Sequence, residues 1–346
     1  MDISLFYFGG QTSGGNDQAT PEPTSYRLLI EGSRLADKIG LSAIWTPERH
    51  FHAFGASYAD PAVTSSAISM ITTRVAIRAG SVVMPLHDPV RLVEQWAMID
   101  NLSGGRVGIS FASGWHPRDF ALAHRQNRYD SRKQDLEPMI ELVRSLWRGE
   151  TVRRESGTGE LVDIQVVPRP LQIDLPTWIT SAGSRDTFEL AGRLGANVLT
   201  HLLGQSREQL AGNIAVYRQA LEIHHPGSPG HVTLMMHTYL SHSVHEATEA
   251  VRKPLSSYLA TALDLEQSSM LSASTPRISH SDRDFLLSRA VDRFVAEDGL
   301  IGTLESTRSR VTKFAGIGVD EIACLVDFGV DEDLVLEGLT RLGDLQ

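Results

Sequence analysis

The feature of this sequence that most constrains its fold is a repeated alternation of short apolar runs with segments of helical periodicity. Runs such as residues 75–83 and 107–111 have the length and apolar character of buried strands. The segments between them begin with helix-start signals, as at Asp88-Pro89, where an N-cap acid precedes a proline at the first helical position. Such alternation is typical of a parallel sheet covered by helices.

Eight strands follow from this pattern, at residues 3–8, 43–46, 75–83, 107–111, 178–180, 197–200, 232–240 and 321–326. Eight strands interleaved with helices predict a single (β/α)8 (TIM) barrel domain over residues 1–346. Residues 151–167 break the alternation and predict a surface hairpin that turns at 156–159.

Residues 241–300 form a predicted insertion between the seventh and eighth strands, because they are too long for one barrel helix and rich in serine. Helical parts are expected at about 247–265 and 284–295. The segment between them acts either as part of a lid over the barrel mouth or as a disordered connector.

Composition excludes several classes of protein. The 32 Lys and Arg residues against 42 Asp and Glu residues give a net charge of −10, so no diffuse basic surface is available for nucleic acid or an anionic membrane. The apolar runs are shorter than the roughly 20 residues that span a bilayer. The first residues, Met1 to Ser4, lack the basic start of a secretory signal, so we expect a cytoplasmic protein. One cysteine, Cys324, excludes an internal disulfide and a thiolate metal cage.

Polar residues at the C-terminal ends of the strands are the candidate site residues, because barrel active sites lie there. The segment Ser181 to Ser184, with Thr187, leads directly into a helix, so backbone N–H groups and hydroxyls would form an anion site. The alternative is that Ser184 simply caps this helix. Arg132 would add a bidentate phosphate contact, unless it is an ordinary exposed arginine. Together these residues predict a site for a phosphorylated cofactor.

A metal site is the rival interpretation. Glu48, His50 and His52 would share one face if the second strand continued that far. With His201 and Asp327 they could form the metal centre of a hydrolase. Such hydrolases carry paired histidines after the first strand, which here ends in glycine, and this weakens the metal hypothesis.

Three other catalytic classes lack their motifs. No strand is followed by a Gly-x-Gly-x-x-Gly turn, and the chain has no Gly-x-x-x-x-Gly-Lys phosphate loop. A Gly-x-Ser-x-Gly nucleophile elbow is also missing. A nicotinamide-binding fold, an NTPase and a serine hydrolase are therefore not indicated.

Three stretches resemble the bacterial luciferase-like flavin monooxygenases: WTPERHF at 45–51, GSVVMPLHDPVR at 80–91 and NLSGGRVGISFASGW at 101–115. Stretches at 116–120, 145–150 and 199–206 resemble a natural-product-biosynthesis subgroup found in or beside nonribosomal peptide and polyketide synthases. The resemblance covers residues 1 to about 245. It implies a barrel that binds reduced FMN at its C-terminal mouth, with O2 adding to the flavin to give a C4a-peroxide that transfers one oxygen atom.

The resemblance also implies roles for individual residues by position. The FMN phosphate would be held by Arg132, the Gly183 backbone, Ser184 and Thr187. The flavin ring would lie against a cis peptide between Gly80 and Ser81, with Ser110 as the small residue near its reactive edge.

The sequence departs from bacterial luciferase itself, in which two histidines follow the glutamate. Here Arg49 takes the first of these places and only His50 remains, so light emission is not expected. We assign catalytic roles to Glu48, His50 and Ser110, with His50 donating a hydrogen bond or moving a proton. The alternative is that His50 is structural and bonds Glu48.

The implied partners are a flavin reductase that supplies reduced FMN, O2 as co-substrate and a second copy of the chain in a homodimer. The substrate would be a secondary-metabolite intermediate, either free or tethered to a carrier protein. The alternatives are a deazaflavin-dependent oxidoreductase of the same fold, a metal-dependent barrel hydrolase and a non-catalytic flavin-binding protein.

Overall fold

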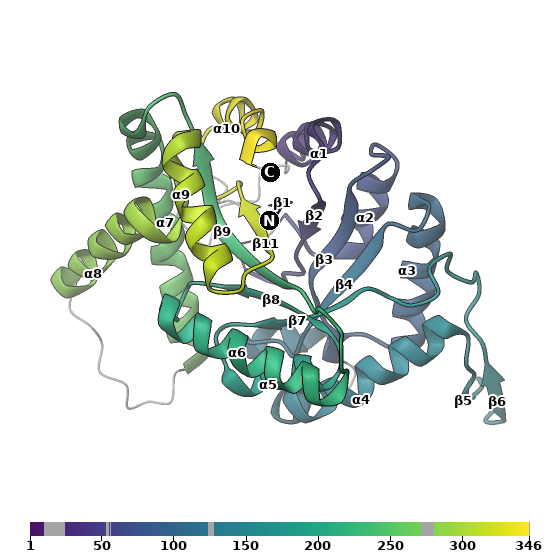
Figure 1. The fold of residues 1–346 in the computed structure, drawn as a ribbon. Coiled ribbons are helices and arrows are strands. Elements are labelled where there is room, and N and C mark those ends of the chain that lie inside the picture. The colour runs from purple at the N-terminus through teal and green to yellow at the C-terminus, as the bar shows by residue number, and fades with distance from the viewer. Residues whose placement is uncertain (10–24, 53–54, 56, 124–127, 271–279, 346) are drawn as a thin grey trace.

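The structure is a computed structural model that describes residues 1–9, 25–52, 55, 57–123, 128–270 and 280–345. Eight parallel strands form a closed barrel in the order β9-β11-β1-β2-β3-β4-β7-β8, and β8 pairs with β9 to close it (Figure 1). The barrel strands are β1 (Asp2–Phe6), β2 (Ala43–Thr46), β3 (Ala76–Val83), β4 (Val107–Ala112), β7 (Thr177–Ser181), β8 (Asn197–His201), β9 (Val232–Leu240) and β11 (Glu321–Leu325). The predicted (β/α)8 barrel is therefore confirmed.

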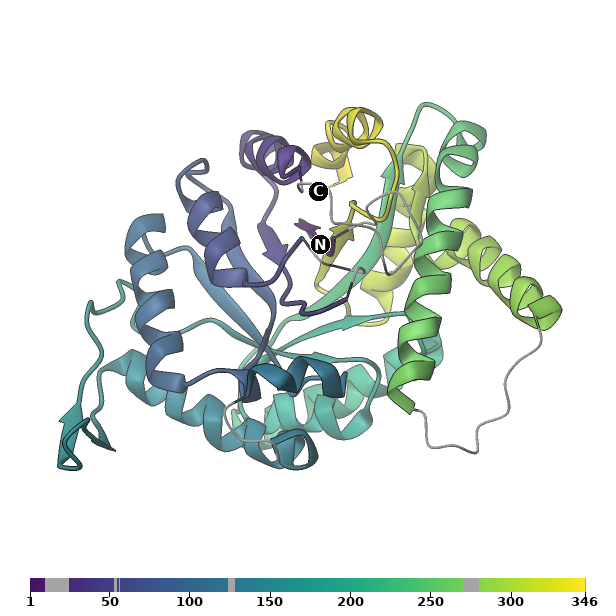
Figure 2. The same ribbon diagram turned by 180° about the vertical axis from the view of Figure 1, so that it is seen from behind.

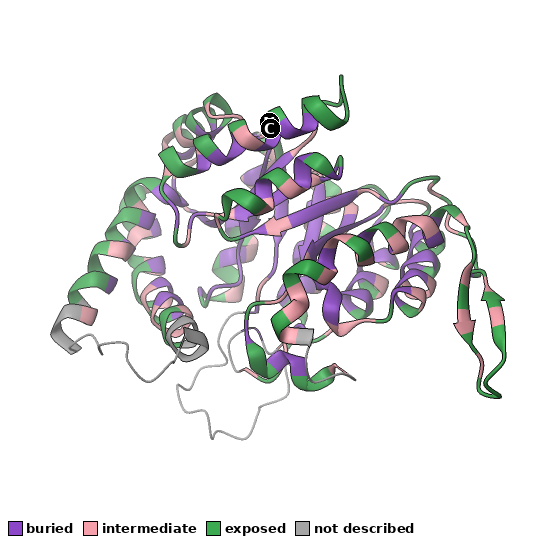
Figure 3. Cartoon of the chain, turned by 90° about the horizontal axis from the view of Figure 1, so that it is seen from below, coloured by how far each residue is buried: buried purple, intermediate pink, exposed green. Residues whose placement is uncertain are grey.

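Helices surround this barrel on the outside. They are α1 (Arg27–Ile39), α2 (Pro61–Ser69), α3 (Pro89–Ser103), α4 (Arg128–Arg148), α5 (Arg185–Arg193), α6 (Arg207–His224), α9 (Leu304–Gly316) and α10 (Glu332–Leu339). Short helical turns are η1 (Met84–Leu86), η2 (Pro117–Leu122), η3 (Phe294–Asp298) and η4 (Leu342–Leu345). Seen from below, buried residues gather on the strands and exposed ones on the outer helix faces (Figure 3).

Local sequence signals fix where two of these helices begin. The Asp60 carboxylate accepts a hydrogen bond from the Ala62 N–H at 2.7 Å, and Asp88 accepts one from the Val90 N–H at 2.9 Å. A proline follows each aspartate at the first helical position, where its missing N–H has no cost. The Asp-Pro signals therefore position the helices that follow β2 and β3.

Two segments lie outside the regular alternation. Strands β5 (Val152–Glu155) and β6 (Leu161–Ile164) form the predicted hairpin, which projects away from the barrel (Figure 1). The insertion between β9 and β11 contains α7 (Val244–Met270), α8 (His280–Arg293) and the short strand β10 (Leu300–Gly302), which pairs with β9. Whether the insertion acts as a lid stays a prediction.

Helix α7 lies beside the barrel, as the view from behind shows (Figure 2), and an aromatic contact places it near the barrel mouth. The ring of its Tyr258 lies 6.0 Å from the ring of Phe8, just after β1, and 4.6 Å from the ring of His237 on β9. No helix within the described ranges is both long and apolar enough to cross a membrane.

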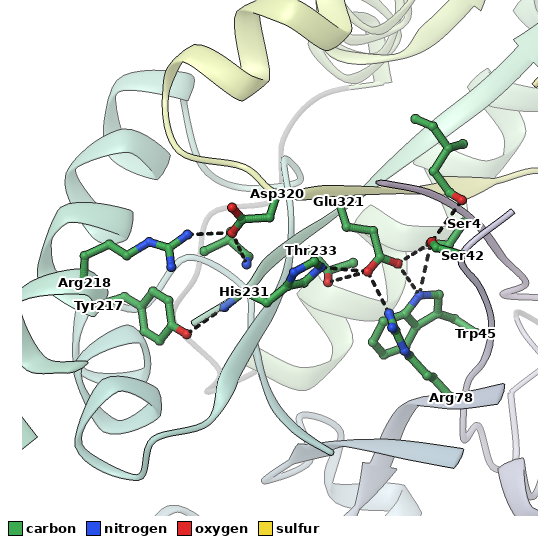
Figure 4. A network of polar contacts seen from close by, with 12 residues as sticks. Ser4, Ser42, Trp45, Arg78, Tyr217, Arg218, His231, Thr233, Asp320 and Glu321 are labelled. Carbon is green, nitrogen blue, oxygen red and sulfur yellow. Dashed lines mark hydrogen bonds and ion pairs between the residues drawn. The ribbon is translucent and has the colours of Figure 1, made fainter. Parts of the chain in front are cut away.

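The floor of the barrel, at the N-terminal ends of the strands, holds a buried carboxylate. Glu321 Oε1 accepts hydrogen bonds from Ser4 Oγ at 2.5 Å and Trp45 Nε1 at 3.0 Å (Figure 4). Its Oε2 pairs with Arg78 at 2.7 Å and His231 at 2.9 Å. Burial alone would raise the pKa of Glu321, but Arg78 and His231 hold this pKa far below its usual range. The floor is therefore a closed, fully paired charge network.

Candidate active site

Three hydroxyl groups meet at the mouth of the barrel, from strands β3, β4 and β7. Thr180 Oγ1 lies 2.5 Å from Ser81 Oγ and 2.6 Å from Ser110 Oγ. The peptide between Gly80 and Ser81 is cis, as the resemblance implied. A side chain at Gly80 would not fit, because its Cβ would lie 2.7 Å from the ring of Phe6. Sequence reasoning selected Ser81 and Ser110 but missed Thr180, which it counted only as part of a strand.

The start of helix α5 has the geometry of an anion site. Ser184 is exposed and its side chain makes no capping hydrogen bond, so the simple N-cap alternative is wrong. Gly183 has a φ of +103°, and a Cβ there would lie 3.2 Å from Gln205. Asn213 on α6 donates to the Gly183 carbonyl at 3.0 Å and so holds the loop between β7 and α5 in place. Thr187 lies on the first turn of the same helix. Backbone N–H groups and hydroxyls at such a position suit a phosphate.

Arg132, near the start of α4, is half-buried and has protein partners. Its Nε donates to the Gly114 carbonyl at 3.1 Å, and another nitrogen donates to the Tyr129 carbonyl at 2.6 Å. The guanidinium also lies 3.9 Å from the centre of the Tyr129 ring. Arg132 therefore connects the loop after β4 to α4, and its contact with a phosphate stays a prediction.

Glu48, after β2, is the centre of a second polar group at the mouth. Its Oε1 lies 2.8 Å from His50 Nε2 and 2.8 Å from His87 Nε2, and its Oε2 accepts the Val83 N–H at 2.7 Å. Burial raises the pKa of Glu48, but the hydrogen bonds from the two histidines outweigh it and lower this pKa overall. Burial lowers the pKa of His87, but Glu48 outweighs that effect and raises it. The bond between His50 and Glu48 that the structural alternative names is therefore present, and the catalytic role of His50 stays a prediction.

His87 is a site residue that sequence reasoning missed. It lies within the stretch 80–91, one position before Asp88, and that stretch was used only for its helix start and its cis peptide. The available signal was the position of His87, four residues after the apolar strand β3 ends at Val83, in the loop region where barrel site residues gather.

The five predicted metal ligands do not come together, so the proposed cluster is wrong. Strand β2 ends at Thr46, and the alternation that would place Glu48 and His52 on one face does not continue. His52 instead lies 3.3 Å from Asp119. The Asp327 carboxylate accepts the backbone N–H groups of residues 8 and 9, at 2.8 and 2.7 Å. Within the described part of the chain, no group of potential ligands combines Glu48, His50, His52, His201 and Asp327.

His52, His116 and Asp119 form another cluster beside this site, with one ligand atom from each lying within 4.8 Å of the others. Burial raises the pKa of Asp119 to about 6.

Arg49 is a buried cation near this cluster. Its guanidinium lies 4.2 Å from the centre of the Phe8 ring. Burial lowers the pKa of Arg49 to about 10, so it remains a cation at neutral pH.

Among curated proteins, this chain is 25% identical to a flavin-dependent trigonelline monooxygenase, oxygenase component, from Acinetobacter baylyi, over 99% of this chain and 93% of the relative. An F420-dependent glucose-6-phosphate dehydrogenase from Amycolatopsis mediterranei is 31% identical over 51% of this chain and 54% of its own length. The first match supports comparison along nearly the whole chain, whereas the second concerns about half of each protein.

Two solved structures share the fold. Monooxygenase RslO1 from Streptomyces bottropensis has a TM-score of 0.79 and 21% identity, over 99% of this chain and 98% of the other. The oxygenating constituent of 3,6-diketocamphane monooxygenase from Pseudomonas putida, in complex with FMN, has a TM-score of 0.73 and 13% identity, over 99% and 97%. The family model described as luciferase-like monooxygenase matches residues 1–321. The chain therefore belongs to the luciferase-like monooxygenase family.

Proposed function

We propose that the chain is the oxygenase component of a two-component, FMN-dependent monooxygenase. It inserts one oxygen atom from O2 into an organic intermediate of secondary metabolism, either free or tethered to a carrier protein. The observation that carries this proposal is the α5 start, where the Ser184 side chain caps no helix N–H, together with the hydroxyl trio of Ser81, Ser110 and Thr180.

The residues at the mouth fit FMN. The loop at Gly183, whose own N–H donates to Ser181 Oγ at 3.2 Å, would hold the phosphate with Ser184 and Thr187 at the positive end of the helix dipole. The cis peptide at Gly80–Ser81 would lie against the flavin ring, where Gly80 has no room for a side chain. Reduced FMN, when bound, supplies the electrons that activate O2.

Side chains of the protein would hold and transfer a proton during the reaction. His50 Nε2 faces the Glu48 carboxylate, so Nδ1 is the ring atom at which His50 would accept or release a proton. Glu48 also bonds His87 and the Val83 N–H, which fixes its orientation. The buried carboxylate stays ionised and holds both imidazoles in place.

The relatives support the remaining parts of the proposal. The relative that aligns along nearly the whole chain is named as an oxygenase component, which agrees with a separate reductase. One structure of this fold holds FMN. We also propose a homodimer, supported by exposed apolar side chains on and directly after α2 and on the neighbouring α3, namely Val63, Met70, Met98 and Leu102. Sedimentation tests the dimer.

The decisive experiment is an anaerobic titration with reduced FMN, followed by admission of O2 and measurement of its consumption. We expect binding and O2 uptake by the wild type, with weaker binding by a double variant Ser184→Ala, Thr187→Ala. Absence of reduced-FMN binding to a folded wild type would contradict the proposal.

A deazaflavin-dependent oxidoreductase is the second candidate, favoured by the half-length match to an F420-dependent dehydrogenase. The same titration with reduced F420 separates the two. Tight binding of F420 without O2 consumption, and no binding of FMN, would establish the second candidate.

A further inference from the structure

Two histidines line the barrel interior on strands that the proposed flavin site does not use. Thr233 on β9 reaches Glu321 inside the barrel, with its Oγ1 3.3 Å from Oε2. Because side chains alternate along a strand, Met235 and His237 face the same interior. His201 at the end of β8 is in register with Met235, so it faces the interior as well. The two histidines therefore lie near the mouth, on its β8–β9 side.

Each of these histidines has a buried ring nitrogen without a partner. His201 Nδ1 and His237 Nε2 have no hydrogen-bond partner within normal geometry among the described residues, although the Leu203 backbone acts on the His201 ring, and His237 is only 1% exposed. Burial lowers the pKa of His201 to about 4 and that of His237 to about 3, so both rings are neutral at pH 7. A buried polar atom left unpaired is unfavourable, and a neutral imidazole can both donate and accept a hydrogen bond.

The surroundings of His237 are aromatic. The rings of Tyr258, Phe294 and Phe328 lie at 4.6, 5.2 and 5.3 Å from its ring, each nearly perpendicular to it. Tyr258 and Phe294 belong to the insertion, so the insertion supplies two of the three rings that pack on His237 and would be walls for a ligand. Such walls favour flat apolar molecules and oppose the burial of a charge.

The charged side chains nearby also bear on the choice of ligand. Arg49 contributes to lowering the pKa of His201, which means that its positive charge acts on this part of the mouth. The Asp327 carboxylate acts on Tyr258 as well, so the charges here are mixed, and the cost of burying a charge among aromatic rings is what disfavours a charged ligand. The preferred ligand group is therefore an uncharged carbonyl or amide oxygen on a planar frame.

We infer that His201 and His237, with Tyr258 of α7, form the substrate-binding half of the mouth and recognise a planar, uncharged organic molecule through a carbonyl or amide group. This inference rests on the proposed function, since it names the substrate class of the same mouth. The flavin half is supplied by β3, β4, β7 and the α5 start, and the substrate half by β8, β9 and α7. The two histidines are binding residues that hold the substrate, with Tyr258 as a wall.

The test uses two probes of nearly equal shape, neutral benzamide and the benzamidinium cation. Each is titrated into full-length protein labelled with ¹⁵N-histidine, with and without FMN. The ring signals are assigned through the variants His201→Phe and His237→Phe, which keep a flat ring and remove the nitrogens. The matched control is His224→Phe, because His224 is an exposed histidine on α6.

In the wild type, we expect benzamide to shift the ring signals of His201 and His237 and to bind at least ten-fold more tightly than benzamidinium. Each of the two phenylalanine variants should weaken benzamide binding at least ten-fold, because the hydrogen bond to the ligand is lost. Neither variant should lower Tm, because each removes a buried nitrogen that has no partner in the free protein. The control variant should bind as the wild type does.

Three results would each overturn the inference: equal binding of the two probes, unchanged benzamide binding by both variants, or no shift of either histidine signal. The proposed function fails separately. If the wild type binds benzamide but not reduced FMN, the inferred pocket stands and the flavin assignment falls. If it binds reduced FMN but not benzamide, only the inference falls.

Discussion

The two ends of one barrel treat buried polar groups in opposite ways. At the floor, all the polar partners of Glu321 come from the protein, and Arg78 neutralises its charge (Figure 4). At the mouth, His201 and His237 each keep a buried ring nitrogen that no described residue satisfies. The difference separates stability from function, because the charged groups of the floor pair with one another without a ligand, and its one unpaired atom in the described residues around Arg78 is the Trp178 ring N–H, whereas at the mouth two histidines that could bind a ligand are unpaired.

The pKa values of a carboxylate at the floor and of one at the mouth are shifted in opposite directions. The pKa of Glu321 is held far below its unfolded value, so its stabilising contribution is present above about pH 4.3 and is lost as the pH falls below it. Burial raises the pKa of Asp327 at the mouth to about 6. Its contribution is present below its unfolded pKa of about 3.9 and is lost as the pH rises through about 6.

The largest effect is expected from breaking the floor. Glu321→Gln leaves the Arg78 guanidinium without its counter-charge and should cost about 3 kcal/mol of unfolding free energy at pH 7, measured by urea denaturation. The variant should also lose less stability than the wild type below pH 4. Glu337→Gln, at an exposed pair with Arg341, is the control and should change little. A floor variant as stable as the wild type would remove the contrast between the two ends.

At the mouth, His50→Gln should reduce oxygen insertion about 100-fold with little change in stability. The glutamine amide can still donate to Glu48, but it cannot exchange a proton near neutral pH. Steady-state kinetics with a substrate that the wild type converts should show a fall in kcat and not a rise in KM. Unchanged kcat would assign His50 the purely structural role.

A third prediction compares two helix starts. Ser184→Ala with Thr187→Ala should weaken reduced-FMN binding about ten-fold, because hydrogen bonds to a phosphate are lost, without loss of stability. Ser206→Ala at the start of α6 removes a true capping bond to the Gln209 N–H and should cost about 1 kcal/mol of stability while FMN affinity stays the same. Anaerobic titration with reduced FMN measures the affinity, and thermal unfolding measures the stability. Equal effects of the two changes on FMN binding would refute the phosphate assignment.

The last prediction concerns Asp327. Asp327→Asn should flatten the dependence of unfolding free energy on pH between about 4 and 6, by about 2 kcal/mol, since the amide does not titrate. Urea denaturation at several pH values measures it. A pH dependence identical to that of the wild type would show that Asp327 titrates normally in the folded protein.

Most of the fold could be predicted because barrel strands and helices leave strong local signals. The apolar run at 107–111 became β4 (Val107–Ala112), and Asp88-Pro89 began α3 as expected. The hairpin and the two insertion helices also followed from local periodicity and turn residues. These signals need only neighbours within a few positions.

The site was harder to predict because its contacts join distant residues. His87 bonds Glu48 across 39 positions, and Thr180 bonds Ser81 across 99, so no local spacing connects them. The metal hypothesis failed because β2 stops at Thr46, two residues before the side chains that it was expected to align. The cis peptide at Gly80–Ser81 was predicted only through the family resemblance.

The position of the insertion has a consequence for how the substrate range of this protein could change. Tyr258 and Phe294 enter the mouth from one continuous stretch that leaves the barrel after β9 and returns before α9. Exchanging that stretch as a single cassette would replace two walls of the substrate pocket at once. The paired floor and the strands that carry the hydroxyl trio would keep their own residues, so selectivity could diversify without rebuilding the scaffold.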